Sequence, residues 1–293
     1  MVATQTERAD APNLMEYSNP SVLGQLSNTC RRRWRTARRF IGLRERHPRP
    51  HFLGVGTQKG GTSSLYHLLK QHPDLYLPDN KEIHYFTKFY ERGDDWYREQ
   101  FEAAPAGLLR GEITPFYLFH EAVPDRIHAL RHDMKIIVLL RNPVDRTLSQ
   151  YFHSCRWNLE TLPLEKALAA EPERLKGALN IIRQPGGTHL SYQEHSYLAR
   201  SRYEEQLPRY LRLFGRNQVL VLRSDGLYDA ERKTLESITQ FLNIRPFPDN
   251  ITIPFENQGA GEAEKVSPEV RKHIAKQLES TFNWLEKTLD ISW

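Results

Sequence analysis

The sequence predicts an α/β protein, a three-layer α/β/α sandwich built around a central parallel sheet. Short apolar runs typical of strands buried in such a sheet occur at 52–56, 135–140 and 218–222. Segments with helical spacing separate these runs, which favours parallel strands joined by helical crossovers. The 293 residues suffice for one sizeable core, since single cores grow to roughly 250–300 residues. We therefore expect one domain, over residues 51–293.

The expected strands and helices follow one another along this domain. Pro73 ends the first helix, Pro143 suits the turn that opens another, and Ser267 can cap the last, with Pro268 in its first turn. Residues 164–191 show a less regular pattern and are expected to be irregular, with a loop at 185–187. Strands are expected at 52–56, 108–113, 135–140 and 218–222, and helices at 62–71, 94–101, 122–130, 201–214 and 231–242, and after residues 143 and 267.

A glycine-rich turn follows the first expected strand and leads into a helix. Residues 57–64 read Thr-Gln-Lys-Gly-Gly-Thr-Ser-Ser. Glycine lets the backbone approach an anion, and a helix start presents N–H groups and the positive end of the helix dipole. Lys59 adds a mobile charge, and residues 62–64 add hydroxyl donors. The pattern indicates a phosphate cradle, with an ordinary glycine-containing turn as the alternative.

The order of residues in this turn is P-loop-like but differs from that of an ATP- or GTP-binding loop. Gly56 and Gly61 have the spacing of such a loop, yet Thr62 stands where its lysine is expected. The lysine lies earlier, at Lys59. An atypical P-loop kinase is disfavoured for this reason, and because no aspartate suited to Mg²⁺ is evident at a strand end.

Positive charge is concentrated ahead of the domain. The net charge is +5, and arginines crowd residues 31–49 within a basic, partly flexible extension expected over residues 1–50. This segment suits either contact with a polyanion or acidic membrane surface, or a solvated arm. A non-catalytic polyanion- or nucleotide-binding protein is therefore the alternative function from another class.

Cysteine content and hydropathy indicate the compartment. Cys30 and Cys155 are the only cysteines, too few for a disulfide framework. No stretch approaches the ~20 apolar residues of a membrane helix, and residues 1–20 lack the apolar core of a signal peptide. These features predict a cytoplasmic protein. The sequence has no zinc-spaced Cys/His cluster, and no metal is expected.

Three segments together resemble the sulfotransferases that use 3′-phosphoadenosine 5′-phosphosulfate (PAPS), especially the heparan-sulfate type and its bacterial relatives. They are the cradle at 57–64, Lys-Glu-Ile-His-Tyr-Phe at 81–86 and the run from Arg141 to Ser149. The resemblance extends over residues 52–293. It implies transfer of a sulfuryl group from PAPS to a hydroxyl or amine of a carbohydrate or related acceptor. Together with the resemblance, the composition leads us to expect a cytoplasmic protein of bacterial type; a truncated Golgi enzyme would look similar.

PAPS carries anionic groups at two separate positions, so its binding requires two anion sites. The cradle supplies one. The second is expected at the carboxyl end of another parallel strand, where Arg141 follows the clearest strand and Ser149 lies on the next helix. In the resembling enzymes the matching arginine and serine hold the 3′-phosphate. The donor-binding residues so implied are Gln58, Lys59, Gly60, Gly61, Thr62, Ser63, Arg141, Ser149 and Asn257.

Sulfuryl transfer also requires a base for the acceptor and positive charge for the leaving phosphate. The resemblance assigns the base to Glu82 and the charge to Lys59. Partial burial beside aromatic residues is expected to raise the pKa of Glu82. His84 is the rival base, since cytosolic-type sulfotransferases use histidine. The alternative for Glu82 is a surface carboxylate paired with Lys81.

His153 is a further candidate for the catalytic group. It lies one turn after Ser149, so both side chains are expected on the same face of the helix. It matches a histidine that matters in the N-sulfotransferase branch of the resembling family. The alternative is a histidine with a purely structural role.

Two departures from the family pattern bear on the acceptor. Ile113 stands where these enzymes usually have a lysine after the glutamate of this stretch. The loop at 255–265 contains Lys265 but lacks the basic cluster with which the animal enzymes close over the donor phosphates. These departures argue against heparan itself as the acceptor.

Overall fold

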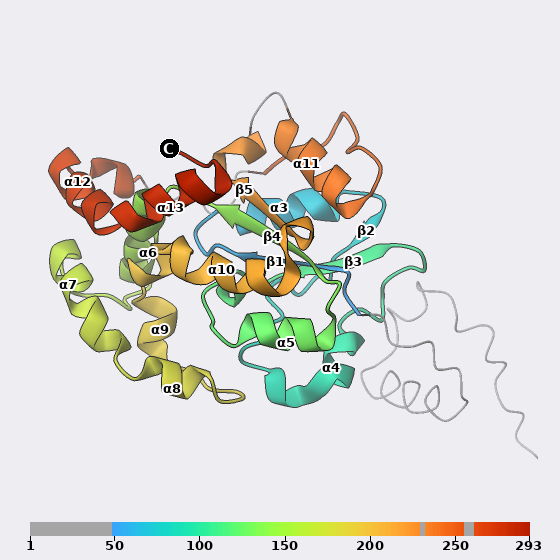
Figure 1. Cartoon of the computed structure of the whole chain (residues 1–293), viewed down its shortest axis with the longest axis horizontal. Coiled ribbons are helices and arrows are strands. Elements are labelled where there is room, and N and C mark those ends of the chain that lie inside the picture. Colours follow the sequence, from blue (N-terminus) through green and yellow to red (C-terminus); the bar gives the residue numbers. More distant parts are fainter. Residues whose placement is uncertain (1–48, 229–231, 255–260) are drawn as a thin grey trace, which may run out of the picture. The chain divides into compact units, whose positions relative to one another are not determined.

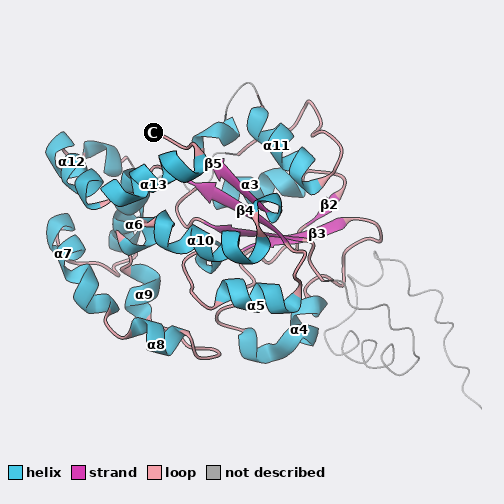
Figure 2. Cartoon of the chain, viewed as in Figure 1, coloured by secondary structure: helices cyan, strands magenta, loops and turns pink. Residues whose placement is uncertain are grey.

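Five parallel strands form the central sheet (Figure 2). The structure is a computed structural model that describes residues 49–228, 232–254 and 261–293, so the expected N-terminal extension lies almost wholly outside it. Every pair of neighbouring strands is parallel, as predicted. In sheet order the strands are β2 (Leu75–Tyr76), β3 (Leu109–Ile113), β1 (Phe52–Gly56), β4 (Lys135–Leu140) and β5 (Val219–Arg223).

Strand residues alternate between two hydrophobic cores, one on each face of the sheet. On β4, Ile136, Val138 and Leu140 belong to one core, whereas Ile137 and Leu139 belong to the other. The first core includes residues of α4 (Gly93–Glu99), α5 (Val123–Leu130), α10 (Tyr203–Phe214) and α13 (Glu279–Leu289), and the second includes residues of α3 (Thr62–Lys70) and α11 (Lys233–Leu242). Helices thus cover both faces (Figure 1), which confirms the predicted three-layer sandwich.

The strand order places a topological switch point between β1 and β4, and the region outside the carboxyl ends of these two strands is called the crevice below. The chain visits β3, on one side of β1, and then crosses to β4 on the other side. Ligands of open α/β sheets bind outside the carboxyl ends of the strands at such a switch point. The segments that follow β1 and β4 lead into α3 and α6 (Pro143–Arg156). Most of the predicted site residues come from these two segments.

The start of α6 is fixed by its cap. The side chain of Asn142 accepts hydrogen bonds from the backbone N–H groups of Val144, at 2.9 Å, and Asp145, at 3.3 Å. Pro143 occupies the first helical position, where no N–H is needed. α6 therefore leaves the carboxyl end of β4 in a defined direction.

The middle of the chain differs from the prediction. Residues 164–194 form three short helices, α7 (Leu164–Leu175), α8 (Ala178–Ile182) and α9 (Leu190–Glu194), around the predicted loop at 185–187. One support for α7 is tertiary: buried Glu171 accepts hydrogen bonds from the backbone N–H groups of Leu198 and Ala199, both at 2.8 Å. Such a contact leaves no periodic signal in the sequence.

The last two helices are α12 (Pro268–Gln277) and α13. Ser267 caps α12 as predicted, since its hydroxyl accepts a hydrogen bond from Val270 N at 3.4 Å. Within the described ranges, no helix is long and apolar enough to span a membrane.

Candidate active site

The predicted cradle joins β1 to α3 and is held against β4. The backbone N–H of Thr57 donates to Leu139 O at 2.8 Å, and Gly60 N donates to Thr57 O at 3.0 Å. A Cβ atom at Gly60 would lie 2.8 Å from Leu139 O, so the close approach requires glycine. Gly61, with φ +87°, begins α3 in the left-handed region, and Lys59 has φ 67°. The structure therefore brings Gln58–Ser63 together at the start of α3.

Arg141 lies beside this cradle. Its Nη1 donates a hydrogen bond to Lys59 O at 3.2 Å, and its own carbonyl accepts one from Tyr203 Oη at 3.0 Å. Ser149 lies half-buried two turns into α6. Among the described residues, no hydrogen bond joins Ser149 to Arg141. Asn257 lies outside the described residues.

Lys59 and His153 meet across the crevice. Lys59 Nζ lies 3.4 Å from His153 Nδ1. Burial, with the nearby charges of Arg156, Arg146 and Arg141, lowers the pKa of Lys59 to about 8. Burial and the charges of Lys59 and Arg156 lower the pKa of His153 to about 4. The imidazole is therefore neutral at neutral pH and accepts a hydrogen bond from the Lys59 ammonium group.

Arg146 is a site residue that the sequence analysis missed. It is fully buried below the cradle, where Nε donates to Gln58 O at 3.2 Å and Nη1 donates to Tyr197 O at 2.7 Å and Ser201 Oγ at 3.0 Å. No described carboxylate forms an ion pair with it. Its position five residues after Arg141, in the first turn of α6, was the available signal. Arg146 adds fixed positive charge to the crevice.

Glu82 and His84 form a second group. Glu82 Oε2 lies 3.3 Å from His84 Nε2, and Glu82 Oε1 lies 3.0 Å from Lys81 Nζ, so the pairing with Lys81 is present. The expected rise in the pKa of Glu82 is wrong. Burial alone would raise it, but His84 and Lys81 outweigh burial and lower the pKa to about 2. Among the described residues, no hydrogen bond or ion pair joins Glu82 to Lys59.

The backbone around Glu82 is unusual. Glu82 and His84 both adopt the left-handed region, with φ 65° and 56°. Few residues other than glycine do so, and the surrounding structure must hold them there. Such strain clusters at functional sites, so the geometry supports this segment as part of the site.

Trp157 is a second residue that the sequence analysis missed. It follows the last turn of α6 and is 68% exposed. Its indole makes an edge contact with the His153 ring, with centroids 6.3 Å apart. The i, i+4 spacing from His153 could have indicated this contact. An exposed aromatic surface therefore adjoins the Lys59–His153 pair.

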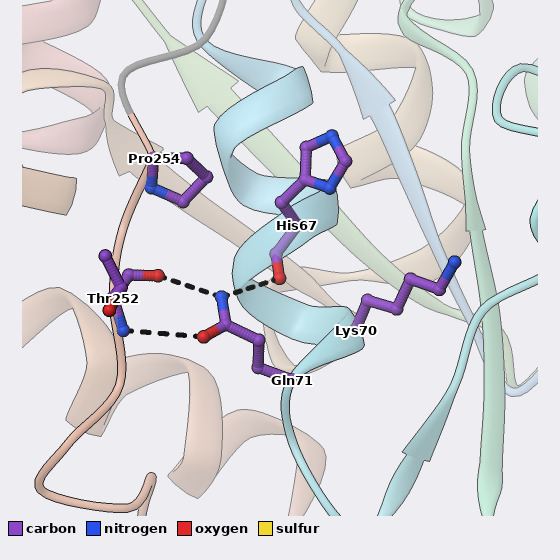
Figure 3. A pocket seen from close by; sticks show the side chains of 5 residues that line it. All are labelled: His67, Lys70, Gln71, Thr252 and Pro254. Carbon is purple, nitrogen blue, oxygen red and sulfur yellow. Dashed lines mark hydrogen bonds between the residues drawn. The ribbon is translucent and has the colours of Figure 1, made fainter.

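A pocket of about 360 Å³ lies at the far end of α3 and contains none of the predicted site residues (Figure 3). It is lined by His67, Lys70, Gln71, Thr252 and Pro254. The Gln71 amide pairs with the backbone of Thr252, at 2.8 Å from Nε2 to the carbonyl and 3.4 Å from the N–H to Oε1. This contact fastens the segment at 251–254 to α3.

Comparison with known proteins identifies the family. Residues 49–281 match the sulfotransferase domain. Human heparan sulfate glucosamine 3-O-sulfotransferase 6 is 41% identical over 120 residues, which are 41% of this chain and 34% of that protein. Membrane-associated sulfotransferase kil1 of Dictyostelium discoideum is 40% identical over 111 residues, 37% of this chain and 24% of that protein. The chain thus matches 34% and 24% of the length of these two relatives.

Longer matches lead to the same family. Human heparan sulfate glucosamine 3-O-sulfotransferase 5 is 26% identical over 255 residues, 80% of this chain and 69% of that protein. The crystal structure of a sulfotransferase from Alicyclobacillus acidocaldarius superimposes with a TM-score of 0.68 at 29% identity, covering 84% of this chain and 98% of that one. The resemblance drawn from the sequence is confirmed: this chain belongs to the sulfotransferase family.

Proposed function

We propose that the protein transfers a sulfuryl group from PAPS to a hydroxyl or amine of a carbohydrate-type acceptor and releases adenosine 3′,5′-bisphosphate. The contact from Arg141 Nη1 to Lys59 O, at 3.2 Å, is the main structural support. It makes two predicted anion sites neighbours at the carboxyl ends of adjacent strands β1 and β4. A nucleotide with anionic groups at both its 5′ and 3′ positions requires such a pair.

The charge of the crevice suits this donor. Burial, followed by the charges of three neighbouring arginines, lowers the pKa of Lys59, and a bound polyanion would relieve the repulsion among these cations. In the proposal, residues 58–63 bind the 5′-phosphosulfate, and Arg141 and Ser149 bind the 3′-phosphate, with Asn257 as a further donor contact.

The proposed step forms one bond to sulfur, breaks another, and moves one proton from the acceptor to the base. The acceptor loses a proton to the base, and its oxygen or nitrogen bonds to sulfur. The bond from sulfur to the bridging oxygen breaks, and its electron pair leaves with the phosphate. The Lys59 ammonium group stabilises that charge. His153 is neutral at neutral pH and accepts from Lys59, so its role in the proposal is to orient Lys59.

The base is proposed to be Glu82, acting with His84. Glu82 Oε2 lies 3.3 Å from His84 Nε2, close enough for the carboxylate and the imidazole to exchange a proton. A proton from the acceptor substrate would be shared by the pair.

The exposed indole of Trp157 supports a carbohydrate-type acceptor. An aromatic face offers apolar contact area with a polar edge, which suits the C–H face of a sugar ring. The indole contacts the His153 ring, and His153 Nδ1 lies 3.4 Å from Lys59 Nζ. Ile113 is buried in the core that includes residues of α3, so its side chain does not face an acceptor and does not decide the acceptor's charge.

Titration calorimetry with adenosine 3′,5′-bisphosphate tests the donor site. We expect binding to the wild type, at least tenfold weaker binding to Arg141→Ala, and no comparable binding of ATP. Equal preference for ATP would instead favour a P-loop kinase. Salt-sensitive binding of any polyanion, unaffected by Arg141→Ala, would favour a non-catalytic polyanion-binding protein.

A further inference from the structure

Glu112, near the end of β3, is a buried carboxyl group that the proposed reaction does not use. Its side chain is 2% exposed, and it forms no ion pair with any described residue. Its hydrogen-bond donors are three hydroxyl groups: Tyr97 Oη at 2.7 Å, Thr114 Oγ1 at 2.8 Å and Tyr117 Oη at 3.0 Å. Burying a carboxyl group without a counter-ion costs free energy, which indicates a role other than packing.

Two of these hydroxyls connect Glu112 to the segment that carries Glu82. Thr114 Oγ1 accepts a hydrogen bond from His84 N, and Tyr117 Oη accepts one from Phe86 N, both at 3.4 Å. A hydroxyl has one hydrogen to donate. Because each donates that hydrogen to Glu112, its lone pairs are free to accept from the backbone. The carboxyl thereby sets the direction of both hydroxyls.

The segment so held is one that the chain would not adopt by itself. Glu82 and His84 have left-handed backbones, which must be imposed by their surroundings. Aromatic packing supplies part of that support, since the Tyr85 ring stacks on Tyr97 with centroids 4.2 Å apart. The hydrogen bonds that His84 N and Phe86 N donate to the two hydroxyls fix the orientation of this backbone.

We propose that Glu112 is a positioning residue: through the hydroxyls of Thr114 and Tyr117 it holds the backbone at 84–86 so that the Glu82 and His84 side chains stay paired. The predicted effect of Glu112 on catalysis rests on the proposed function, in which Glu82 and His84 take the acceptor proton. The predicted effect of Glu112 on the position of His84 does not depend on the proposed function.

Tyr97 and Tyr117 provide a matched pair of variants for the test. Both are fully buried tyrosines that donate to the same oxygen of Glu112, but only Tyr117 also accepts from the 84–86 backbone. Tyr97→Phe and Tyr117→Phe each remove one phenolic oxygen and leave the ring in place. Glu112→Gln keeps the shape of the side chain but presents an NH₂ group to one of the hydroxyls, which disturbs their directions.

The first readout is the NMR signal of the His84 ring in histidine-labelled protein, assigned with His84→Asn. We expect Glu112→Gln and Tyr117→Phe to move this signal and Tyr97→Phe to leave it unchanged, with adenosine 3′,5′-bisphosphate affinity within twofold of wild type in all three. An unmoved signal in Glu112→Gln, or equal changes in the two tyrosine variants, would overturn the proposal. This readout needs no turnover, so it remains valid if the wild type transfers no sulfuryl group.

The second readout applies once an acceptor oligosaccharide is found. Glu112→Gln and Tyr117→Phe should lower kcat at least tenfold with little change in KM, whereas Tyr97→Phe should keep kcat within twofold. Thr114→Ser, which preserves the hydroxyl, should retain activity, and Thr114→Val should lose it. A loss of kcat that follows the melting temperature in every variant would show that Glu112 acts only on stability.

Discussion

Donor binding should draw a proton onto Lys59. In the empty site, burial and three neighbouring arginines lower the pKa of this side chain from 10.5 to about 8. A bound bisphosphate adds negative charge beside the ammonium group and raises that pKa again. The affinity of adenosine 3′,5′-bisphosphate should therefore fall as pH rises from about 8 towards 10.5, because binding then requires proton uptake.

The size of the effect follows from the two pKa values. At pH 8, about half of the empty molecules hold neutral Lys59, and at pH 7 about a tenth do. If binding restores the ordinary pKa of 10.5, uptake at Lys59 is about 0.5 proton per molecule at pH 8 and about 0.1 at pH 7. The fivefold difference between the two pH values is the diagnostic quantity.

Calorimetry in buffers of different ionisation enthalpy measures this uptake, as the slope of the binding enthalpy against the buffer enthalpy. Lys59→Arg is the matched control, because arginine keeps the charge and does not titrate in this range. Lys59→Arg should abolish the uptake at pH 8 while retaining most of the affinity, and Lys59→Met should lose both. A slope at pH 8 that is the same in Lys59→Arg and wild type would refute the reasoning.

Three further predictions concern the crevice. Gly60→Ala would place a Cβ atom 2.8 Å from Leu139 O, so urea denaturation should show a loss of about 1–3 kcal/mol, and bisphosphate binding should weaken. Arg146→Met would leave the carbonyl of Gln58 without its donor, at a cost of about 1–3 kcal/mol in the same experiment, together with weaker donor binding; unchanged affinity would exclude Arg146 from the site's electrostatics. Trp157→Ala should leave unfolding free energy within about 0.5 kcal/mol of wild type and raise the acceptor KM several-fold, whereas an unchanged KM would remove the indole from the acceptor site.

The sheet and the cradle could be predicted because their signals are local. The apolar run at 135–140 is β4 without change, and the glycines at 60 and 61 occupy positions that require a close approach or a positive φ. Arg141 could be placed because the carboxyl end of a parallel strand is a known position for ligand groups. Such inferences need only the neighbouring residues along the chain.

The missed features depend on contacts between distant residues. The pKa of Glu82 is lowered, not raised, because the left-handed turn at His84 brings the His84 ring against the Glu82 carboxylate. No residue pattern in the sequence predicts that turn. Helix α7 is supported by backbone groups of Leu198 and Ala199, which lie 27 and 28 residues beyond Glu171. The role of Glu112 depends on residues up to 28 positions away along the chain, such as His84 (112 − 84 = 28).

A transfer assay with radiolabelled PAPS tests the central claim most directly. The protein would be incubated with oligosaccharides that offer free hydroxyl and amine groups, and labelled product would be measured together with adenosine 3′,5′-bisphosphate. We predict that wild type forms the two in equal amounts, and that Glu82→Gln still binds the bisphosphate but transfers label at least about 100-fold more slowly. Release of bisphosphate without labelled product, or transfer by Glu82→Gln at the wild-type rate, would contradict the account.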